Sequence, residues 1–251
     1  MSHPLDGARA KVARAQEHFD TFEREAEAFI RSDPYEVVCE VEPNGTQYVY
    51  RIRIRESPPI RLSICIGGAL YNLRSSLDHV AWQLALLHGP PPPMTEFPVF
   101  SDRTAYLSES PRKLKGIGAQ PQALIESLQP YHFPEPDGSL LWMLHRLSNI
   151  DKHRLLHLTG GAIGSSHFQI PPGAELMHRM FCAPFEDNAE FARFILPNPD
   201  TVVDMDVHPA FGIAFDKYPL NADGVFFVDE VLRAIMDFVS SVVPSFDPFF
   251  T

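Results

Sequence analysis

The chain has 251 residues, of which 45% are hydrophobic and 21% charged, and its net charge at neutral pH is −11. This length accommodates one large domain or two small ones, and the composition is typical of a globular protein. The acidic charge argues against a broad basic surface for duplex nucleic acid, although it leaves room for a small basic site. The three cysteines show no CxxC spacing, so neither a disulfide framework nor a zinc knuckle is indicated.

No apolar run reaches the ~20 residues of a transmembrane helix, and the N-terminus lacks the basic-then-apolar pattern of a signal peptide. We therefore expect a cytoplasmic protein with reduced thiols and no membrane association. The glycines at 160, 161 and 164 follow a predicted helix and lack a lysine partner, so we interpret them as a linker rather than a phosphate loop. We expect no cofactor.

The first predicted elements are an amphipathic helix over residues 7 to 32 and a β-hairpin over residues 35 to 55. Asn44-Gly45 is a type I′ turn signal, and strictly alternating residues flank it. This register places Tyr35 opposite Ile54 on one face. On the other face it places arginines against glutamates, which we interpret as cross-strand pairing rather than a nucleic-acid stripe: Glu36, Glu40, Arg51, Arg53 and Arg55.

The middle of the chain contains one long helix and a proline-rich connection. Leucines at nearly heptad spacing predict a helix over residues 60 to 88, in which Gly67 and Gly68 suggest close approach by a neighbour. The connection from Gly89 to about Gln120 is expected to be extended. A short helix over residues 121 to 129 follows it.

The second half of the chain is expected to be helical, then strand-rich, then helical. Ser139 is a good N-cap for a helix over residues 139 to 158, and Gly160-Gly161 would end that helix. Residues 167 to 220 form a predicted β region, and residues 227 to 243 form the last helix. The strand candidates are Arg179 to Cys182, Phe191 to Leu196, Val202 to Val207 and Gly212 to Phe215.

Polar clusters on two of these helices indicate where the protein acts. Each cluster holds an Arg, an Asn, an Asp and a His within about two turns. Desolvating such groups is costly unless they satisfy one another, so a chain rarely concentrates them twice without a use. The first cluster is Asn72, Arg74, Asp78 and His79, and the second is Arg146, Asn149, Asp151, His153 and Arg154.

The spacing within the second cluster favours a functional role. Asp151 projects into the apolar arc of its helix, where its carboxylate needs a cation that Arg74 or Arg154 would supply. The remaining polar residues line a neighbouring stripe: Arg146, Asn149 and His153.

The clusters resemble the R-x(4–6)-H signature of the HEPN superfamily. Arg74 precedes His79 with four residues between them, and Arg146 precedes His153 with six between them. The chain also resembles uncharacterised bacterial proteins with NLRSxLDHxAWQL and NIDKHR segments. Two departures are Ser75 and Leu147, where the family has a polar Asn, Asp or His directly after the Arg. The resemblance implies a four-helix bundle, of which the hairpin and the strand-rich region are not part. The four predicted helices, the hairpin and the β region together predict an α+β fold in one domain, 1–251: a HEPN-like four-helix bundle with an inserted β-hairpin and an additional small antiparallel β region.

The resemblance also implies a metal-independent endoribonuclease or an RNA-binding protein. The arginines would bind the scissile phosphate, and the histidines would act as general acid and base: Arg74, His79, Arg146 and His153. Five residues would orient them: Asn72, Asp78, Asn149, Asp151 and Arg154. The family is commonly dimeric. We expect a homodimer here also because Trp82 and Tyr71 lie off the apolar stripe and the C-terminal phenylalanines need cover.

Two alternatives belong to other classes of protein. The clusters could form one buried network that fixes helix register or an interface in a non-catalytic structural or interaction module. Alternatively, nitrogen and oxygen ligands on two helices could hold Fe, Mn or Zn in a metal-dependent enzyme, although no Glu-x-x-His pair occurs. The candidate ligands would be Asp78, His79, Asp151, His153 and His157.

Overall fold

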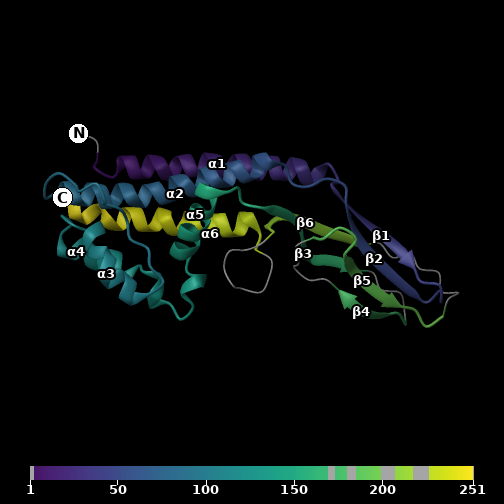
Figure 1. Ribbon diagram of the computed structural model, residues 1–251. Coiled ribbons are helices and arrows are strands. Elements are labelled where there is room, and N and C mark those ends of the chain that lie inside the picture. The colour runs from purple at the N-terminus through teal and green to yellow at the C-terminus, as the bar shows by residue number, and fades with distance from the viewer. Residues whose placement is uncertain (1–2, 169–172, 180–184, 199–206, 217–225, 251) are drawn as a thin grey trace.

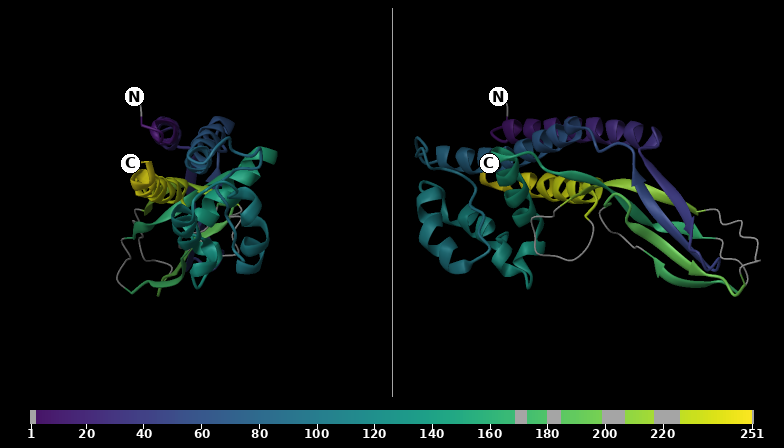
Figure 2. Two further views of the ribbon diagram at one scale, coloured as in Figure 1. Left: turned by 90° about the vertical axis from the view of Figure 1, so that its left-hand side faces the viewer. Right: turned by 45° about the vertical axis from the view of Figure 1, so that its right-hand side comes forward.

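The computed structural model shows a mixed α+β protein, with packed helices at one end and antiparallel sheets at the other (Figure 1). Both ends of the described chain lie at the helical end (Figure 1). The sheets extend beyond the opposite end of the helices, so the molecule is elongated (Figure 2). The structure describes residues 3–168, 173–179, 185–198, 207–216 and 226–250.

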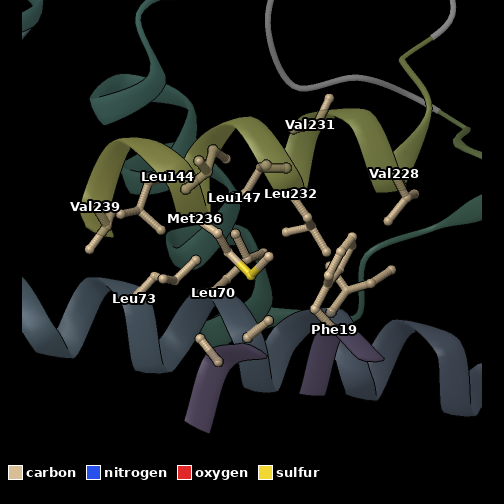
Figure 3. Close-up of a cluster of buried hydrophobic side chains, with 14 of the residues drawn as sticks. Phe19, Leu70, Leu73, Leu144, Leu147, Val228, Val231, Leu232, Met236 and Val239 are labelled. Carbon is tan, nitrogen blue, oxygen red and sulfur yellow. The ribbon is translucent and has the colours of Figure 1, made fainter. Parts of the chain in front are cut away.

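Four helices form the core, in agreement with the predicted bundle segments. The helices α1 (Asp6–Arg31) and α2 (Ile60–Leu86) lie side by side and antiparallel, and α6 (Val228–Val242) runs alongside them. The fourth helix, α5 (Leu140–His153), contacts α2 and α6. Their apolar stripes meet in one cluster (Figure 3), which includes Phe19, Leu70, Leu73, Leu144, Leu147, Leu232 and Met236.

The helix α5 begins as predicted but ends five residues early. Ser139 is the N-cap, and its Oγ accepts a hydrogen bond from the Trp142 amide at 3.3 Å. Arg154 is extended, and the strand β3 (Leu158–Phe168) follows. The linker interpretation of Gly160 is therefore wrong. A Cβ at Gly160 would lie 2.4 Å from Tyr35 Cζ, so the glycine permits close aromatic packing on this strand.

The connection from residue 89 to 120 contains a helix that the sequence did not reveal. This helix, α3 (Arg103–Lys113), begins at Asp102, whose carboxylate accepts from the Ala105 amide at 2.8 Å. The next helix, α4 (Ala119–Ser127), is the predicted short helix shifted by two residues. Two single turns of 3-10 helix follow α4: η1 (Pro130–His132) and η2 (Pro136–Gly138). A longer 3-10 segment, η3 (Val243–Phe250), follows α6.

The strands form two antiparallel sheets. Besides β3, the described strands are β1 (Tyr35–Val41), β2 (Gln47–Ile54), β4 (Glu175–Arg179), β5 (Glu190–Ile195) and β6 (Val207–Phe215). The four-stranded sheet has the order β1-β2-β5-β4, and the two-stranded sheet pairs β3 with β6. Two predicted strands, Phe191 to Leu196 and Gly212 to Phe215, fall on β5 and β6. The other two, Arg179 to Cys182 and Val202 to Val207, lie almost wholly outside the described residues.

The hairpin register is confirmed, but its turn type was wrong. Tyr35 pairs with Ile54, as the alternation predicted. The turn hydrogen bond runs from the Gly45 amide to the Glu42 carbonyl at 2.8 Å, so Pro43 and Asn44 occupy the central positions. Gly45 has φ +69°, whereas Asn44 is not in the left-handed region that a type I′ turn requires. Pro43 explains why the turn lies one residue earlier than the predicted Asn44-Gly45 turn. The fixed φ of proline suits the first central position of a type I or type II turn.

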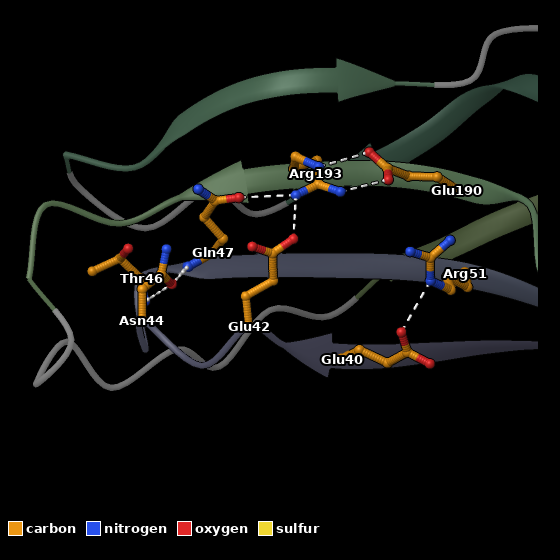
Figure 4. Close-up of polar contacts among 8 residues, drawn as sticks. All are labelled: Glu40, Glu42, Asn44, Thr46, Gln47, Arg51, Glu190 and Arg193. Atoms are coloured by element: carbon orange, nitrogen blue, oxygen red, sulfur yellow. Dashed lines mark hydrogen bonds and ion pairs between the residues drawn. The ribbon is translucent and has the colours of Figure 1, made fainter.

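Ion pairs join neighbouring strands on the polar face of this sheet (Figure 4). Arg51 Nε lies 3.0 Å from Glu40 Oε2. Arg55 binds Glu36 at 2.9 Å, and both ion pairs confirm cross-strand pairing. On β5, Arg193 contacts Glu190 at 2.8 Å and Glu42 at 2.6 Å. Arg51, Arg55 and Arg193 all have carboxylate partners among the described residues, so this face of the sheet is not an unpaired basic stripe.

The C-terminal phenylalanines close the helical end. Phe246 is fully buried and packs edge-on against Phe97, with ring centroids 6.3 Å apart. Phe246, one of the C-terminal phenylalanines expected to need cover, is therefore covered by the helical end of its own chain. Among the described residues, no helix combines the length and apolar character that crossing a membrane requires.

Candidate functional site

The first polar cluster binds a backbone segment of the protein itself. Arg74 on α2 is buried, and its Nη2 donates to the Phe97 carbonyl at 2.6 Å. The Phe97 amide donates to Asp78 Oδ1 at 2.9 Å, and Arg74 and Asp78 pair at 3.0 Å. The ion pair therefore satisfies both backbone groups of Phe97, much as a neighbouring strand would.

A buried glutamine continues this pattern along the same extended segment. Gln129 is fully buried; its Nε2 donates to the Pro98 carbonyl at 2.9 Å, and its Oε1 accepts from the Phe100 amide at 3.1 Å. The side chains of Arg74, Asp78 and Gln129 thus form the hydrogen bonds that a neighbouring strand would otherwise form with residues 97 to 100. We call the hydrogen bonds of Arg74 and Asp78 to the backbone of Phe97 the clamp on Phe97. Because both side chains are engaged in it, their first role is structural.

The other two members of the first cluster point elsewhere. Asn72 is buried, and its amide donates to the Gly68 carbonyl one turn earlier at 2.8 Å. His79 is exposed and lies against α1, where a Cβ at Gly7 would be 3.2 Å from its Nδ1. Arg74 and His79 therefore project from different sides of α2, since five positions along a helix place them about 140° apart.

Asp151 packs against a glycine of α2 rather than against a cation. A Cβ at Gly67 would lie 2.3 Å from Asp151 Oδ1, so the missing side chain creates the space for this carboxylate. Burial raises the pKa of Asp151. The expected partners were wrong: Arg74 pairs with Asp78, and Arg154 is exposed beyond the end of α5.

The exposed side of α5 carries the second R-x(4–6)-H pair. Arg146 and His153 are both exposed and lie two turns apart, which places them on one face of the helix. Asn149 lies beside them, and its Nδ2 is 3.0 Å from Nε2 of His145. His145 was absent from the predicted site residues, although it lies within the same sequence segment.

The charges of groups on α2, α3 and α5 act on His145, and we call these groups together with the histidine the charged cluster. Burial, together with Arg74, Lys113 and Lys152, lowers the pKa of His145 to about 4, and Glu96 opposes this effect. His145 is therefore neutral at pH 7. Its ring stacks on Trp142 at a centroid distance of 5.4 Å. A histidine three residues after a tryptophan on an amphipathic helix was the only sequence signal for this contact.

The carboxylates of the cluster already have cation partners. Burial would raise the pKa of Glu96, but its hydrogen bond and ion pair with Lys113 lower that pKa below the usual value. Burial raises the pKa of Asp78, although the charge of Arg74 and the Phe97 amide oppose the increase. Lys152 is exposed near both carboxylates, and none of the described ion pairs includes it.

The five candidate metal ligands do not converge. Among the described residues, no three His, Cys, Asp or Glu side chains are grouped so that they could hold a metal ion. Comparisons with protein-family models, curated proteins and solved structures found no match. Any functional assignment therefore rests on the geometry of the chain.

Proposed function

We propose that this chain is a HEPN-like RNA-binding protein whose RNA-contacting surface is the exposed side of α5. The supporting observation is charge placement. In a chain of net charge −11, α5 and its C-cap carry Arg146, Lys152 and Arg154, with Asp151 as the single carboxylate. That carboxylate faces α2. The exposed side of α5 therefore offers cations for phosphates, which dominate the affinity of proteins for RNA.

Arg146 and His153 could add metal-independent cleavage to this binding. Arg146 would hold the scissile phosphate, while a histidine takes the proton from the ribose 2′-hydroxyl as that oxygen attacks phosphorus. The bond to the 5′-oxygen breaks, and a second histidine donates a proton to it. A homodimer would supply the two histidines from two copies of His153.

An exposed apolar stripe on α2 supports the proposed homodimer. Its five side chains are between 42% and 64% exposed, and their spacing places them along one side of the helix. Exposed apolar side chains that gather on one surface are found where proteins bind partners. The stripe consists of Ile60, Ile64, Tyr71, Trp82 and Leu86.

Cleavage of single-stranded RNA in EDTA tests the nuclease proposal. We expect His153→Ala and Arg146→Ala each to abolish cleavage, and the melting temperature of His153→Ala to stay nearly unchanged. Arg31→Ala, which removes an exposed cation from α1, is the matched control and should cleave normally. Loss of activity in all three variants, or activity retained without His153, would reject this mechanism.

RNA binding and dimer formation are tested separately. Fluorescence anisotropy with a labelled oligoribonucleotide should show affinity that falls steeply with salt and weakens in Arg154→Ala. Light scattering should give a dimer for the wild type and a monomer for Trp82→Glu. A wild-type monomer at micromolar concentration would remove the dimer and the two-histidine site.

The second candidate function is a non-catalytic interaction module. It is favoured by the clamp of Arg74 and Asp78 on Phe97, which gives this part of the first cluster a structural role. If the wild type neither binds nor cleaves RNA but remains a folded dimer, this candidate replaces the first.

A further inference from the structure

A cavity of about 630 Å³ lies where the packed helices meet the sheets. Three elements bound it: the C-terminal half of α1, the middle of β6 and the first turn of α6 (Figure 1). Its apolar lining comes from Ala26 and Ile30 of α1 and from Phe211 and Ile213 of β6. A cavity of this size is within the range that proteins use to bind ligands.

The backbone groups of β6 serve its two edges in alternation, as in any strand. The Asp216 amide donates to the His157 carbonyl, next to β3, at 3.0 Å. The Phe215 amide donates to the Phe226 carbonyl on the opposite edge at 3.1 Å. From residue 211 to residue 216, even-numbered residues therefore face β3, and odd-numbered residues face the other edge.

Two odd-numbered residues, Phe211 and Ile213, have backbone groups available on that other edge. Outside the pairing with β3, no hydrogen bond among the described residues uses the amide or carbonyl of Phe211 or the amide of Ile213. Both residues also line the cavity, so these groups lie beside it. A strand edge with unpaired amides and carbonyls is a template for a further strand.

The chain itself places one residue on this edge. Ala214 pairs with Phe227 in an isolated antiparallel bridge, and α6 begins at the next residue, Val228. The first turn of α6 therefore ends the pairing just before the cavity. A strand added beside Phe211 and Ile213 must end at this point, because Phe227 occupies the next position.

The carboxylates of the cavity lining indicate which end of the added strand lies there. Glu23 pairs with Arg233 and Glu27 pairs with Arg31, both at 2.5 Å. Asp229, in the first turn of α6, has no ion pair among the described residues. A carboxylate at the blocked end of the edge attracts the α-ammonium of a peptide and repels its α-carboxylate.

The position of Asp229 thus sets the direction of the added strand. A strand with its N-terminus beside α6 runs opposite to β6, in the same direction as Phe226 and Phe227. An unpaired cation, Arg24, also lines the cavity, but it belongs to α1 and not to the helix that blocks the edge. The antiparallel direction therefore agrees with the charge and with the existing bridge.

We propose that this edge of β6 binds the N-terminal segment of an extended peptide as an antiparallel third strand of the β3–β6 sheet. The free backbone groups of Phe211 and Ile213 pair with the peptide backbone, and apolar side chains on alternate peptide residues enter the cavity. The peptide α-ammonium meets Asp229. This site goes beyond the proposed function, because it lies outside α5 and needs neither RNA nor a second copy of the chain.

Hydrogen exchange of single amides, followed by NMR in the full-length protein, tests the strand pairing. The probe is the synthetic peptide Val-Thr-Val-Lys-Val-Thr with a free N-terminus. Binding should slow exchange of the Phe211 amide by about tenfold or more. The Gly212 amide, which faces β3, should be unaffected and is the internal control. Binding that leaves Phe211 unprotected, or no binding at millimolar peptide, would overturn the site.

Acetylation of the peptide N-terminus tests the contact with Asp229. The acetylated peptide should bind the wild type about threefold more weakly, as expected for the loss of one exposed ion pair. Asp229→Asn should bind both peptides equally. Glu230→Gln, a neighbouring exposed carboxylate that does not line the cavity, should still prefer the free N-terminus. Equal affinity of the wild type for both peptides would overturn the assigned direction.

Filling the cavity tests whether the peptide enters it. Ala26→Phe should weaken peptide binding by about tenfold or more, whereas Ala28→Phe, the same change at an exposed position of α1, should not. Ala26→Leu replaces the phenylalanine variant if thermal unfolding shows that the latter does not fold. Equal affinity of the Ala26 and Ala28 variants would overturn the site. RNA binding that persists in these variants while peptide binding is lost would separate this site from the proposed function.

Discussion

Gly67→Ala tests the packing of α5 on α2 through a single methyl group. The new Cβ would lie 2.3 Å from Oδ1, 2.5 Å from Oδ2 and 2.6 Å from Cγ of Asp151. Because the whole carboxyl group is in the way, rotation about its last bond cannot relieve the overlap. Either α5 moves away from α2 or Asp151 leaves its rotamer.

The expected magnitude combines two opposing effects. Overpacking of this kind costs about 1–3 kcal/mol, whereas replacing glycine by alanine within a helix gains about 1 kcal/mol. We therefore expect Gly67→Ala to destabilise the protein by up to about 2 kcal/mol. In a chain of this size, that upper value corresponds to a decrease in melting temperature of about 4–8 °C.

A double-mutant cycle checks the cause. In an Asp151→Ala background the obstructing carboxyl is gone, so Gly67→Ala should stabilise the protein by up to about 1 kcal/mol. Gly68→Ala is the matched control, because its Cβ would meet only the rotatable ring of His18, at 2.9 Å. Thermal unfolding by circular dichroism measures all four variants. Stabilisation by Gly67→Ala in the presence of Asp151 would refute the packing described for α5.

Three further predictions concern the buried polar groups. Arg74→Ala should lose about 2–4 kcal/mol in urea unfolding, because the Phe97 carbonyl and Asp78 lose their donor. Arg31→Ala, which breaks an i,i+4 pair with 74% and 61% exposed side chains, should lose under about 0.5 kcal/mol; equal losses would contradict the clamp. Asp151→Asn should melt above the wild type at pH 7. The raised pKa of Asp151 makes its ionised form destabilising, so this advantage should vanish as the pH falls through that pKa, and a pH-independent difference would contradict it. His145 has a folded pKa of about 4 against an ordinary value of 6.5, so its stabilising effect is complete above pH 6.5 and decreases as the pH falls toward 4. His145→Gln should remove that part of the acid sensitivity, and unaltered acid unfolding would contradict it.

The elements with a clear periodic pattern could be predicted from the sequence. The helices around Phe19, Leu70 and Leu232 follow from apolar residues at three- and four-residue spacing. The hairpin register follows from alternation on both sides of the turn. The helix α3 was missed because it is largely polar and contains Pro111, which usually argues against a helix.

Elements that depend on distant contacts could not be predicted. Gly160 resembles linker sequence, and its place in β3 follows from the rings of Tyr35 and Phe185, which occupy the space beside it. The clamp on Phe97 depends on bonds between side chains and backbone, which leave no periodic signal in a proline-rich segment. The sequence indicated Arg74 and Asp78 as important, but it contained no sign that their partner was the chain itself.

The strand order has a consequence for how the chain acquires its structure during synthesis. Contacts of α1 with α2 and of β1 with β2 join residues that are close in sequence, so this half can assemble early. The ladder between β2 and β5 joins residues 47–51 to residues 190–195. Until that distant segment leaves the ribosome, the edge of β2 has no β5 to pair with and is open to other strands. The nascent protein therefore depends on its last third to protect its first hairpin from aggregation.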